Sequence, residues 1–272
     1  MTRSIYIASV EGDTGKSTIA LGITALLART VTKVGIFRPV ARVSTGSDYV
    51  LRLLLGYDGV DLDYDECVGV TYEEIHADPE AALSRIVTRY HEVARKCDAV
   101  VIVGTDYTDV AGPAEFELNA KVAANLGAPV ALVIRGADRS PSDIADVLVQ
   151  ARSTMEDHHA KVVAVFANRC EPNDVEAIRK ALPADIGVAA LPEEPLLYAP
   201  TLGALRDAID GEMIAGDEAL LSREVRAISI GAMTVEHLLD RLEEGALIIA
   251  PGDRSDTLLA ALTAHSATGF PA

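Results

Sequence analysis

The sequence predicts an α/β fold with a mainly parallel sheet that carries helices on both faces. Short runs rich in Val, Ile and Ala alternate with helical patterns through most of the 272 residues. Most of these runs are almost continuously apolar, which is typical of strands buried on both faces of a sheet. Hydrophobic residues make up 49% and charged residues 24% of the chain, so a large core can form.

Six strands are expected in this sheet. They are Ile5–Ser9, Val34–Phe37, Ala99–Gly104, Val130–Arg135, Val162–Ala167 and Ile186–Ala190. The helices expected between them are Lys16–Arg29, 78–96, Pro113–Leu126, Ser142–Glu156 and Asp174–Leu182. Asp78-Pro79-Glu80 is typical of a helix start, because it combines a cap, a first-turn proline and an acidic residue. Between residues 43 and 78 the alternation stops, and we expect a long surface segment with one helix near Tyr49–Leu55.

A smaller second unit is expected after Gly211. Its elements are a strand at Arg226–Ile230, a helix at Val235–Glu243, a strand at Ala246–Ala250 and a helix at Asp256–His265. Such a βαβα unit leaves sheet edges uncovered and has a small core, so alone it would be marginally stable. We therefore expect two domains, 1–211 and 212–272, and interpret the second as a partial domain.

The composition argues against several classes of function. Acidic residues outnumber basic ones by 41 to 24, and a formal net charge of −17 argues against binding to nucleic acid or anionic membranes. No apolar run reaches the roughly 18 residues of a membrane span, and no secretory signal is visible, so we expect a cytoplasmic protein. The spacing of Cys67, Cys97 and Cys170 fits neither a zinc site nor a disulfide framework, which predicts reduced thiols.

The first expected strand leads into a glycine-containing loop and then a helix. This segment reads Glu11-Gly12-Asp13-Thr14-Gly15-Lys16-Ser17-Thr18. A strand, such a loop and a helix are the context of a phosphate-binding loop, as in P-loop NTPases, and we expect residues 12–18 to bind an anion. Gly12 and Gly15 allow backbone N–H groups to converge on it. Lys16 would reach phosphate oxygens and Ser17 would offer its hydroxyl to Mg²⁺, although the strict motif has glycine where this chain has Val10.

Polar residues near the ends of the other strands are further candidates, because open α/β sheets bind ligands at their carboxyl edge. They are Arg38, Asp106, Arg135, Asp138 and Asn168. Of these, we expect Arg38 and Asn168 to contact the ligand. Asp48 follows the second strand and could fold back over the phosphates as a metal ligand. No Ser, His and Asp arrangement is discernible, and we assign no catalytic residue.

Several of these segments resemble the dethiobiotin synthetase branch of the P-loop proteins. The matching segments are 11–17, Arg38-Pro39-Val40, Ser47-Asp48, Ala167-Asn168-Arg169 and Leu191-Pro192-Glu193. The resemblance implies that the loop binds ATP, that Asp48 binds Mg²⁺ and that Asn168 reads adenine. Arg38 replaces a family lysine and cannot gain and lose a proton as an amine does. Val103 replaces a glutamate that binds Mg²⁺, so the departures predict a domain that has lost the ligase chemistry.

The C-terminal part resembles the start of a DRTGG domain, in segments 228–234, 245–247 and 251–256. The two domains in this order resemble the N-terminal half of long-form phosphate acetyltransferases, and the strings TGKSTIALG, VGIFRPV and VGTDYTD are most similar to the actinobacterial type. The resemblance implies a cytoplasmic enzyme of acetate metabolism that interconverts acetyl-CoA plus phosphate and acetyl phosphate plus CoA. Its acetyl-transfer site belongs to a separate C-terminal domain. We therefore expect this chain to be a non-catalytic region for regulation and assembly, within a homo-oligomer.

Two other functions remain open. A stand-alone ATP-dependent ligase of the dethiobiotin synthetase or cobyrinate-amidating type would use Lys16 and Mg²⁺, but Arg38 and Val103 count against it. A switch ATPase of the partitioning type usually has a lysine early in the loop, where this chain has Glu11. Because Glu11 and Asp13 would repel phosphate, we expect ATP binding that is weak and dependent on Mg²⁺, or a site for a smaller anion or metabolite.

Overall fold

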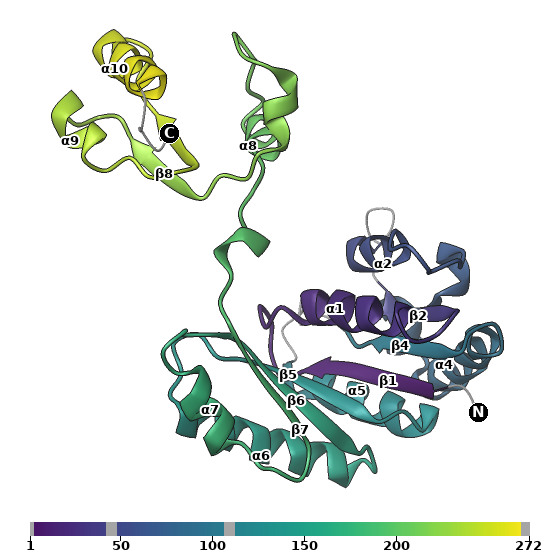
Figure 1. Cartoon of the computed structure of the whole chain (residues 1–272). Helices are drawn as coiled ribbons and strands as arrows, with labels where there is room; N and C mark the ends of the chain where they lie inside the picture. The colour runs from purple at the N-terminus through teal and green to yellow at the C-terminus, as the bar shows by residue number, and fades with distance from the viewer. Residues whose placement is uncertain (1–2, 42–47, 106–111, 268–272) are drawn as a thin grey trace. The chain divides into compact units, whose positions relative to one another are not determined.

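The computed structural model describes residues 3–41, 48–105 and 112–267, and the chain forms two compact units, Met1–Glu193 and Glu194–Ala272. The first unit holds a large sheet and the second a small one (Figure 1). The domain boundary predicted at 211/212 falls inside the second unit and stays a prediction. Thr201 and Glu224, which lie on either side of that position, pair in an antiparallel bridge.

The large sheet has seven strands, all paired in parallel, in the order β3-β2-β4-β1-β5-β6-β7. They are β1 (Arg3–Ser9), β2 (Val34–Ala41), β3 (Val68–Thr71), β4 (Ala99–Val103), β5 (Val130–Arg135), β6 (Val162–Cys170) and β7 (Gly187–Pro192). The predicted parallel sheet is therefore confirmed. Every residue of β4 is buried, as its unbroken apolar run indicates.

The edge strand β3 differs from the sequence prediction, which had a surface segment there. It has only four residues, and a Cβ on Gly69 would lie 2.3 Å from the carbonyl oxygen of Pro39 in β2. A short strand with a central glycine gives no clear apolar pattern, which is why it was missed. The 3₁₀ helix η1 (Tyr64–Glu66) precedes it and α3 (Tyr72–Ala77) follows it, while the helix predicted near Tyr49–Leu55 is confirmed as α2.

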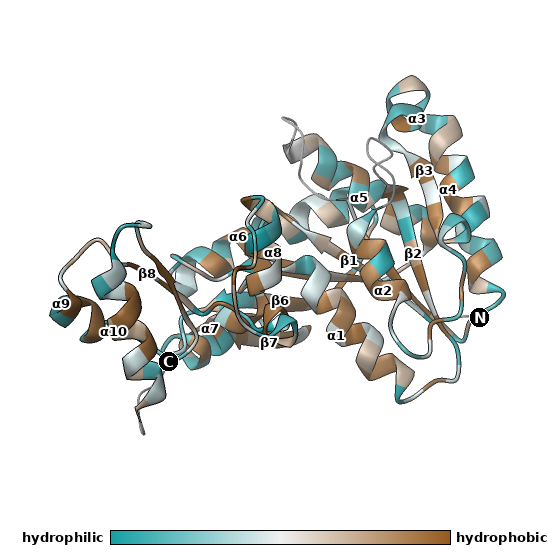
Figure 2. Ribbon diagram, turned by 90° about the horizontal axis from the view of Figure 1, so that it is seen from above, coloured by the Kyte–Doolittle hydropathy of each residue, from teal (hydrophilic) through white to brown (hydrophobic). Residues whose placement is uncertain are grey.

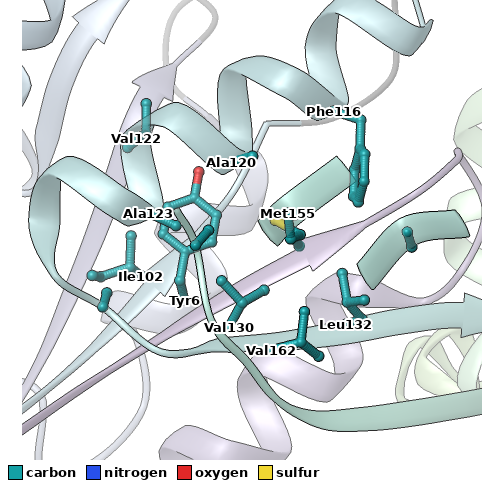
Figure 3. Close-up of a cluster of buried hydrophobic side chains, with 14 of the residues drawn as sticks. Tyr6, Ile102, Phe116, Ala120, Val122, Ala123, Val130, Leu132, Met155 and Val162 are labelled. Atoms are coloured by element: carbon teal, nitrogen blue, oxygen red, sulfur yellow. The ribbon is translucent and has the colours of Figure 1, made fainter. Parts of the chain in front are cut away.

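Helices cover both faces of the sheet, as predicted (Figure 1). Helices α1 (Lys16–Ala28) and α2 (Tyr49–Leu55) lie on one face, and α4 (Pro79–Ala94), α5 (Gly112–Leu126), α6 (Pro141–Asp157) and α7 (Val175–Ala181) on the other. The neighbours Tyr6 and Ile7 in β1 belong to different apolar clusters, because successive strand residues point to opposite faces. Figure 3 shows part of the cluster that contains Tyr6, where Phe116 of α5 and Met155 of α6 also lie.

Local capping groups set the ends of several helices. The Asp78 side chain accepts a hydrogen bond from Ala81 N–H at 3.1 Å, so the predicted start of α4 is confirmed. At the start of α6, Ser140 and Asp143 form a reciprocal capping box. Gly127 follows α5 with a φ of 59°, the left-handed conformation that ends many helices.

The second unit confirms the predicted order of two strands and two helices. Its elements are η2 (Pro195–Leu197), α8 (Leu202–Ala208), η3 (Glu218–Ser222), β8 (Ala227–Ile230), α9 (Val235–Leu239), β9 (Ala246–Ile249) and α10 (Ser255–Ser266). β8 and β9 pair in parallel, and α9 ends earlier than predicted. Figure 2 shows much of α10 in the hydrophobic colour. Among the helices that the structure describes, none has both the length and the hydropathy needed to cross a bilayer.

Candidate functional site

The predicted phosphate-binding loop follows β1 and ends at α1, at the carboxyl edge of the large sheet. Asp13 and Gly15 have φ angles of 54° and 75°, in the left-handed region. Residues in this conformation, placed between right-handed ones, turn successive N–H groups toward a common point. A Cβ on Gly15 would lie 2.4 Å from Nδ2 of Asn168, so the Asn168 side chain would have to move, and the left-handed φ of this position favours glycine.

The side chain of Lys16 is bound to the backbone beyond the end of β4. Its ammonium nitrogen Nζ donates to the carbonyl oxygen of Gly104 at 2.8 Å and also to that of Thr105. Lys16 is only 5% exposed. The group predicted to reach phosphate is therefore held by two carbonyl oxygens, and an anion in the loop would compete with them for it.

Arg38 and Asp48 form a buried ion pair beside Lys16. Arg38 Nε lies 2.9 Å from Asp48 Oδ2, and Arg38 Nη1 donates to the carbonyls of Val103, at 3.3 Å, and Gly104. The two residues are 3% and 8% exposed. Asp48 Oδ1 also accepts from Leu51 N–H at 3.0 Å and so caps α2. A Mg²⁺ ion would have to share this carboxylate with Arg38, so the metal-binding role of Asp48 stays a prediction.

Asn168 and Arg169, at the end of β6, bind the backbone of the loop at Thr14 and Asp13. Asn168 Nδ2 donates to the carbonyl oxygen of Thr14 at 2.8 Å, and Arg169 Nη1 donates to that of Asp13 at 3.0 Å. Arg169 Nε also donates to Glu193 Oε1 at 2.9 Å. Asn168 thus lies at the loop as predicted, with its amide nitrogen bound to the loop backbone. Its predicted contact with adenine stays a prediction.

The acidic side chain at the start of the loop has a counter-charge that the sequence analysis missed. Arg139, between β5 and α6, donates to both carboxylate oxygens of Glu11, at 2.5 and 2.9 Å. Its hydrogen bond to Glu11 raises the pKa of the Arg139 guanidinium above its ordinary value. The repulsion expected from Glu11 is therefore partly offset. The neighbouring candidates Arg135 and Asp138 pair with each other at 3.2 Å.

A buried polar network behind the loop involves residues that the sequence analysis did not single out. Asn119 of α5 accepts from the Tyr6 hydroxyl at 2.7 Å and from Thr105 N–H at 3.0 Å. Its Nδ2 donates to Thr105 Oγ1 at 2.7 Å. Figure 3 shows the Tyr6 side chain pointing toward α5. The network fixes the position of Thr105, whose carbonyl accepts from Lys16. A lone Asn in the apolar stripe of a helix was the available sequence signal.

The structure thus brings most of the predicted site residues to one edge of the sheet. The loop residues, Arg38, Asp48 and Asn168 are connected there by the contacts above, while Ser17 is half-buried and Thr18 exposed in the first turn of α1. Ser47 and Asp106 lie outside the described residues. In the part of the chain that the structure describes, no three His, Cys, Asp or Glu side chains are grouped so that they could hold a metal ion.

Two family models match the chain in succession. A model described as an AAA domain, AAA_26, matches residues 3–201, and a model of the DRTGG domain matches residues 204–269. The first match includes the loop, the buried ion pair and the ends of all seven strands of the large sheet. The order of the two domains agrees with the order expected from the sequence.

Curated relatives match both domains. The phosphate acetyltransferase of Nitratidesulfovibrio vulgaris is 29% identical over 286 residues, which cover 100% of this chain and 40% of that protein. The phosphate acetyltransferase of Synechocystis is 26% identical over 284 residues, which cover 100% of this chain and 41% of that protein. The chain thus spans less than half the length of these relatives. Among solved structures, the cell division ATPase MinD of Pyrococcus furiosus matches 72% of this chain and 85% of its own, with 19% identity and a TM-score of 0.45.

Proposed function

Because the chain belongs to the AAA domain family AAA_26 and continues into a DRTGG domain, we propose that it is the regulatory and assembly region of a phosphate acetyltransferase. The observation that carries this proposal is the match of both domains, over the full chain, to about 40% of the length of proteins with that name. Regulation and assembly are functions that a region outside the acetyl-transfer site can serve. We place this region in a cytoplasmic homo-oligomer.

Within this region, the loop is proposed to bind a small anionic metabolite or a nucleotide. The left-handed residues Asp13 and Gly15 support an anion site formed by main-chain N–H groups. Lys16 supports it too, because its ammonium group lies at the same edge of the sheet. To reach the anion, Lys16 would have to leave the carbonyls of Gly104 and Thr105, so part of the binding free energy would be lost. We therefore expect weak binding, and for ATP a dependence on Mg²⁺.

Calorimetry can test the proposed anion site. The 272-residue chain is titrated with ATP with and without Mg²⁺, and with inorganic phosphate. We expect weak binding that Lys16→Ala abolishes, whereas Lys161→Ala, an exposed residue at the amino end of β6, leaves it unchanged. Thermal melting of both variants checks that they fold. Tight binding of ATP without Mg²⁺, or binding that survives Lys16→Ala, would contradict the proposal.

The regulatory role is tested in the protein encoded by the complete reading frame. We expect acetyl phosphate formation by that protein and none by the 272 residues alone. Lys16→Ala should change how acetyl transfer responds to ATP or phosphate, or change the oligomeric state, and should leave the uninhibited turnover rate similar. Acetyl transfer by the 272-residue chain would show that the assignment is wrong.

The geometry gives the ligase alternative no support. Lys16, the cation that a ligase would need at its phosphates, is engaged by the carbonyls of Gly104 and Thr105. Arg38, which replaces the family lysine, is engaged by the carbonyls of Val103 and Gly104. Val103 offers no carboxylate at the end of β4. Release of ADP on supply of an acid substrate would favour the ligase over the regulatory region.

A further inference from the structure

A cavity of about 490 Å³ lies between α3, α4 and α5, within the first unit and apart from the phosphate-binding loop. This volume falls within the range of about 300 to 1,000 Å³ found for pockets that bind small molecules. Its wall is largely apolar, formed by residues such as Ile75, Leu83, Ile86 and Leu118. Such a wall favours a ligand with a hydrocarbon or aromatic body.

Two carboxylates line this apolar cavity, Glu80 of α4 and Glu115 of α5, and of the two only Glu115 is buried. Glu115 of α5 is 9% exposed, and its Oε1 accepts a hydrogen bond from the Tyr72 hydroxyl at 2.6 Å. Lys121 and His76 also line the cavity but are exposed to solvent. Among the described residues, no cationic side chain forms an ion pair with Glu115. The carboxylate is therefore buried with a neutral hydrogen-bond donor in place of a counter-charge.

A buried carboxylate without a cationic partner is unfavourable, because it has lost hydration that one hydroxyl does not replace. A ligand with a positive group at Glu115 would supply the missing charge, and a charge-assisted hydrogen bond is stronger than a neutral one. We infer that this cavity binds a small organic cation, with its apolar body against Leu83 and Leu118 and its ammonium group at Glu115. The buried carboxylate of Glu115 favours a positively charged ligand, and the apolar wall favours a hydrophobic one.

The inference does not depend on the proposed function, since the cavity shares no lining residue with the phosphate-binding loop. A structural connection exists nevertheless. The Glu115 carbonyl accepts from Asn119 Nδ2 at 2.9 Å, one turn along α5, and Asn119 holds Thr105. A ligand that shifts this turn of α5 would therefore act on the carbonyl that binds Lys16.

Three probes of matched size test the inference by calorimetry on the 272-residue chain: 4-phenylbutylammonium, 4-phenylbutanol and 4-phenylbutyrate. We expect the ammonium compound to bind at least about tenfold more tightly than the alcohol, because a charge-assisted hydrogen bond contributes more than a neutral one. The carboxylate compound should bind weakest. Nuclear Overhauser contacts from the phenyl protons to the methyl groups of Leu83 and Leu118 would locate the probe.

Variants separate the charge of Glu115 from its shape. Glu115→Gln can still accept from Tyr72, and we expect it to reduce ammonium affinity about tenfold while alcohol binding stays the same. Glu117→Gln is the control, because Glu117 is exposed on the same helix and does not line the cavity. If Glu115→Gln does not fold, Tyr72→Phe is the second variant. It removes the hydroxyl donor and keeps the Glu115 carboxylate, so it should still bind the ammonium compound more tightly than the alcohol. Equal affinity for the three probes, an unchanged ammonium affinity in Glu115→Gln, or no binding at millimolar concentration would overturn the inference.

Discussion

Arg139 and Glu11 are 128 positions apart in the sequence and form a two-fold hydrogen-bonded ion pair at the start of the predicted phosphate-binding loop. This pair changes the electrostatic interpretation of the loop. An acid at this position indicates repulsion of phosphate when it is considered from the sequence alone. In the folded chain, the Arg139 guanidinium partly offsets the charge of Glu11, so the repulsion of an anion at the loop would be smaller than the sequence alone indicates.

The coupling free energy between Arg139 and Glu11 can be measured by a double-mutant cycle. Arg139→Gln should lower the free energy of unfolding by about 1 kcal/mol, because the pair is two-fold but only partly buried. It should also weaken anion binding at the loop, since Glu11 then repels the ligand. Glu11→Gln in the same background should restore part of both losses. Urea unfolding of the two single variants and the double variant gives the coupling free energy, and strictly additive effects would contradict the prediction.

Gly15→Ala should destabilise the first unit by about 1 to 3 kcal/mol, because the residue has a left-handed φ and its new methyl group would collide with Asn168. Gly22→Ala is the matched control on α1. A Cβ at Gly22 meets no atom within 4 Å, so this change should raise stability by up to about 1 kcal/mol. Thermal or urea unfolding measures both. Equal effects of the two substitutions would show that the loop conformation imposes no requirement for glycine.

Asp48→Ala should lower the free energy of unfolding, measured by urea titration, by about 3 to 5 kcal/mol, because it leaves the Arg38 guanidinium buried without its counter-charge. Asp48 also caps α2, so the loss of a cap must be measured separately. Asp78→Ala removes an exposed helix cap without a buried ion pair and should cost about 1 kcal/mol. Replacement of both partners by apolar residues, Arg38→Met with Asp48→Leu, should restore much of the stability. A cost of Asp48→Ala no larger than that of Asp78→Ala would refute the importance of the pair.

The cysteines should differ in reactivity. Burial, with a smaller contribution from Cys97, raises the pKa of the Cys67 thiol to about 12, and Cys67 has no exposed surface. Near neutral pH, iodoacetamide should therefore modify the half-buried Cys97 first, and Cys67 only in unfolded chains. Peptide mass spectrometry after timed labelling measures the order. Because the pKa of Cys67 is higher in the folded chain, its contribution to stability is complete below about pH 9 and decreases as the pH rises toward 12. Labelling of Cys67 as fast as Cys97 would contradict this.

Local patterns were sufficient to predict most of the fold. The strands with continuous Val and Ile and the helices with proline or polar caps were predicted within a few residues of their observed bounds. β3 was missed because its four residues derive their conformation from pairing with β2, where Gly69 lies against Pro39. That contact joins segments 30 residues apart, and a pattern confined to one segment does not contain it.

The candidate site likewise contains residues that local patterns predict and contacts that depend on the folded arrangement of the strands and helices. The succession of strand, glycine-containing segment and helix predicted the loop between β1 and α1, and the carboxyl-edge rule predicted that Arg38 and Asn168 lie at the same edge of the sheet. Their contacts with a ligand stay predictions. The partners of these residues were not predictable in the same way. Arg139 contacts Glu11 only because β5 lies next to β1, and the strand order was unknown from the sequence. Asn119 is one polar residue among apolar ones, and its role depends on where α5 places it relative to Thr105.

The two-stranded sheet of the second unit affects how the protein responds to heat. β8 and β9 pair only with each other among the described strands, and Ile228, Ile230 and Ile249 remain about half exposed. An isolated pair of strands is marginally stable in water, whereas the large sheet of the first unit is covered on both faces. Calorimetric heating of the 272-residue chain should therefore give two transitions, with the second unit melting at the lower temperature and exposing its isoleucines to self-association.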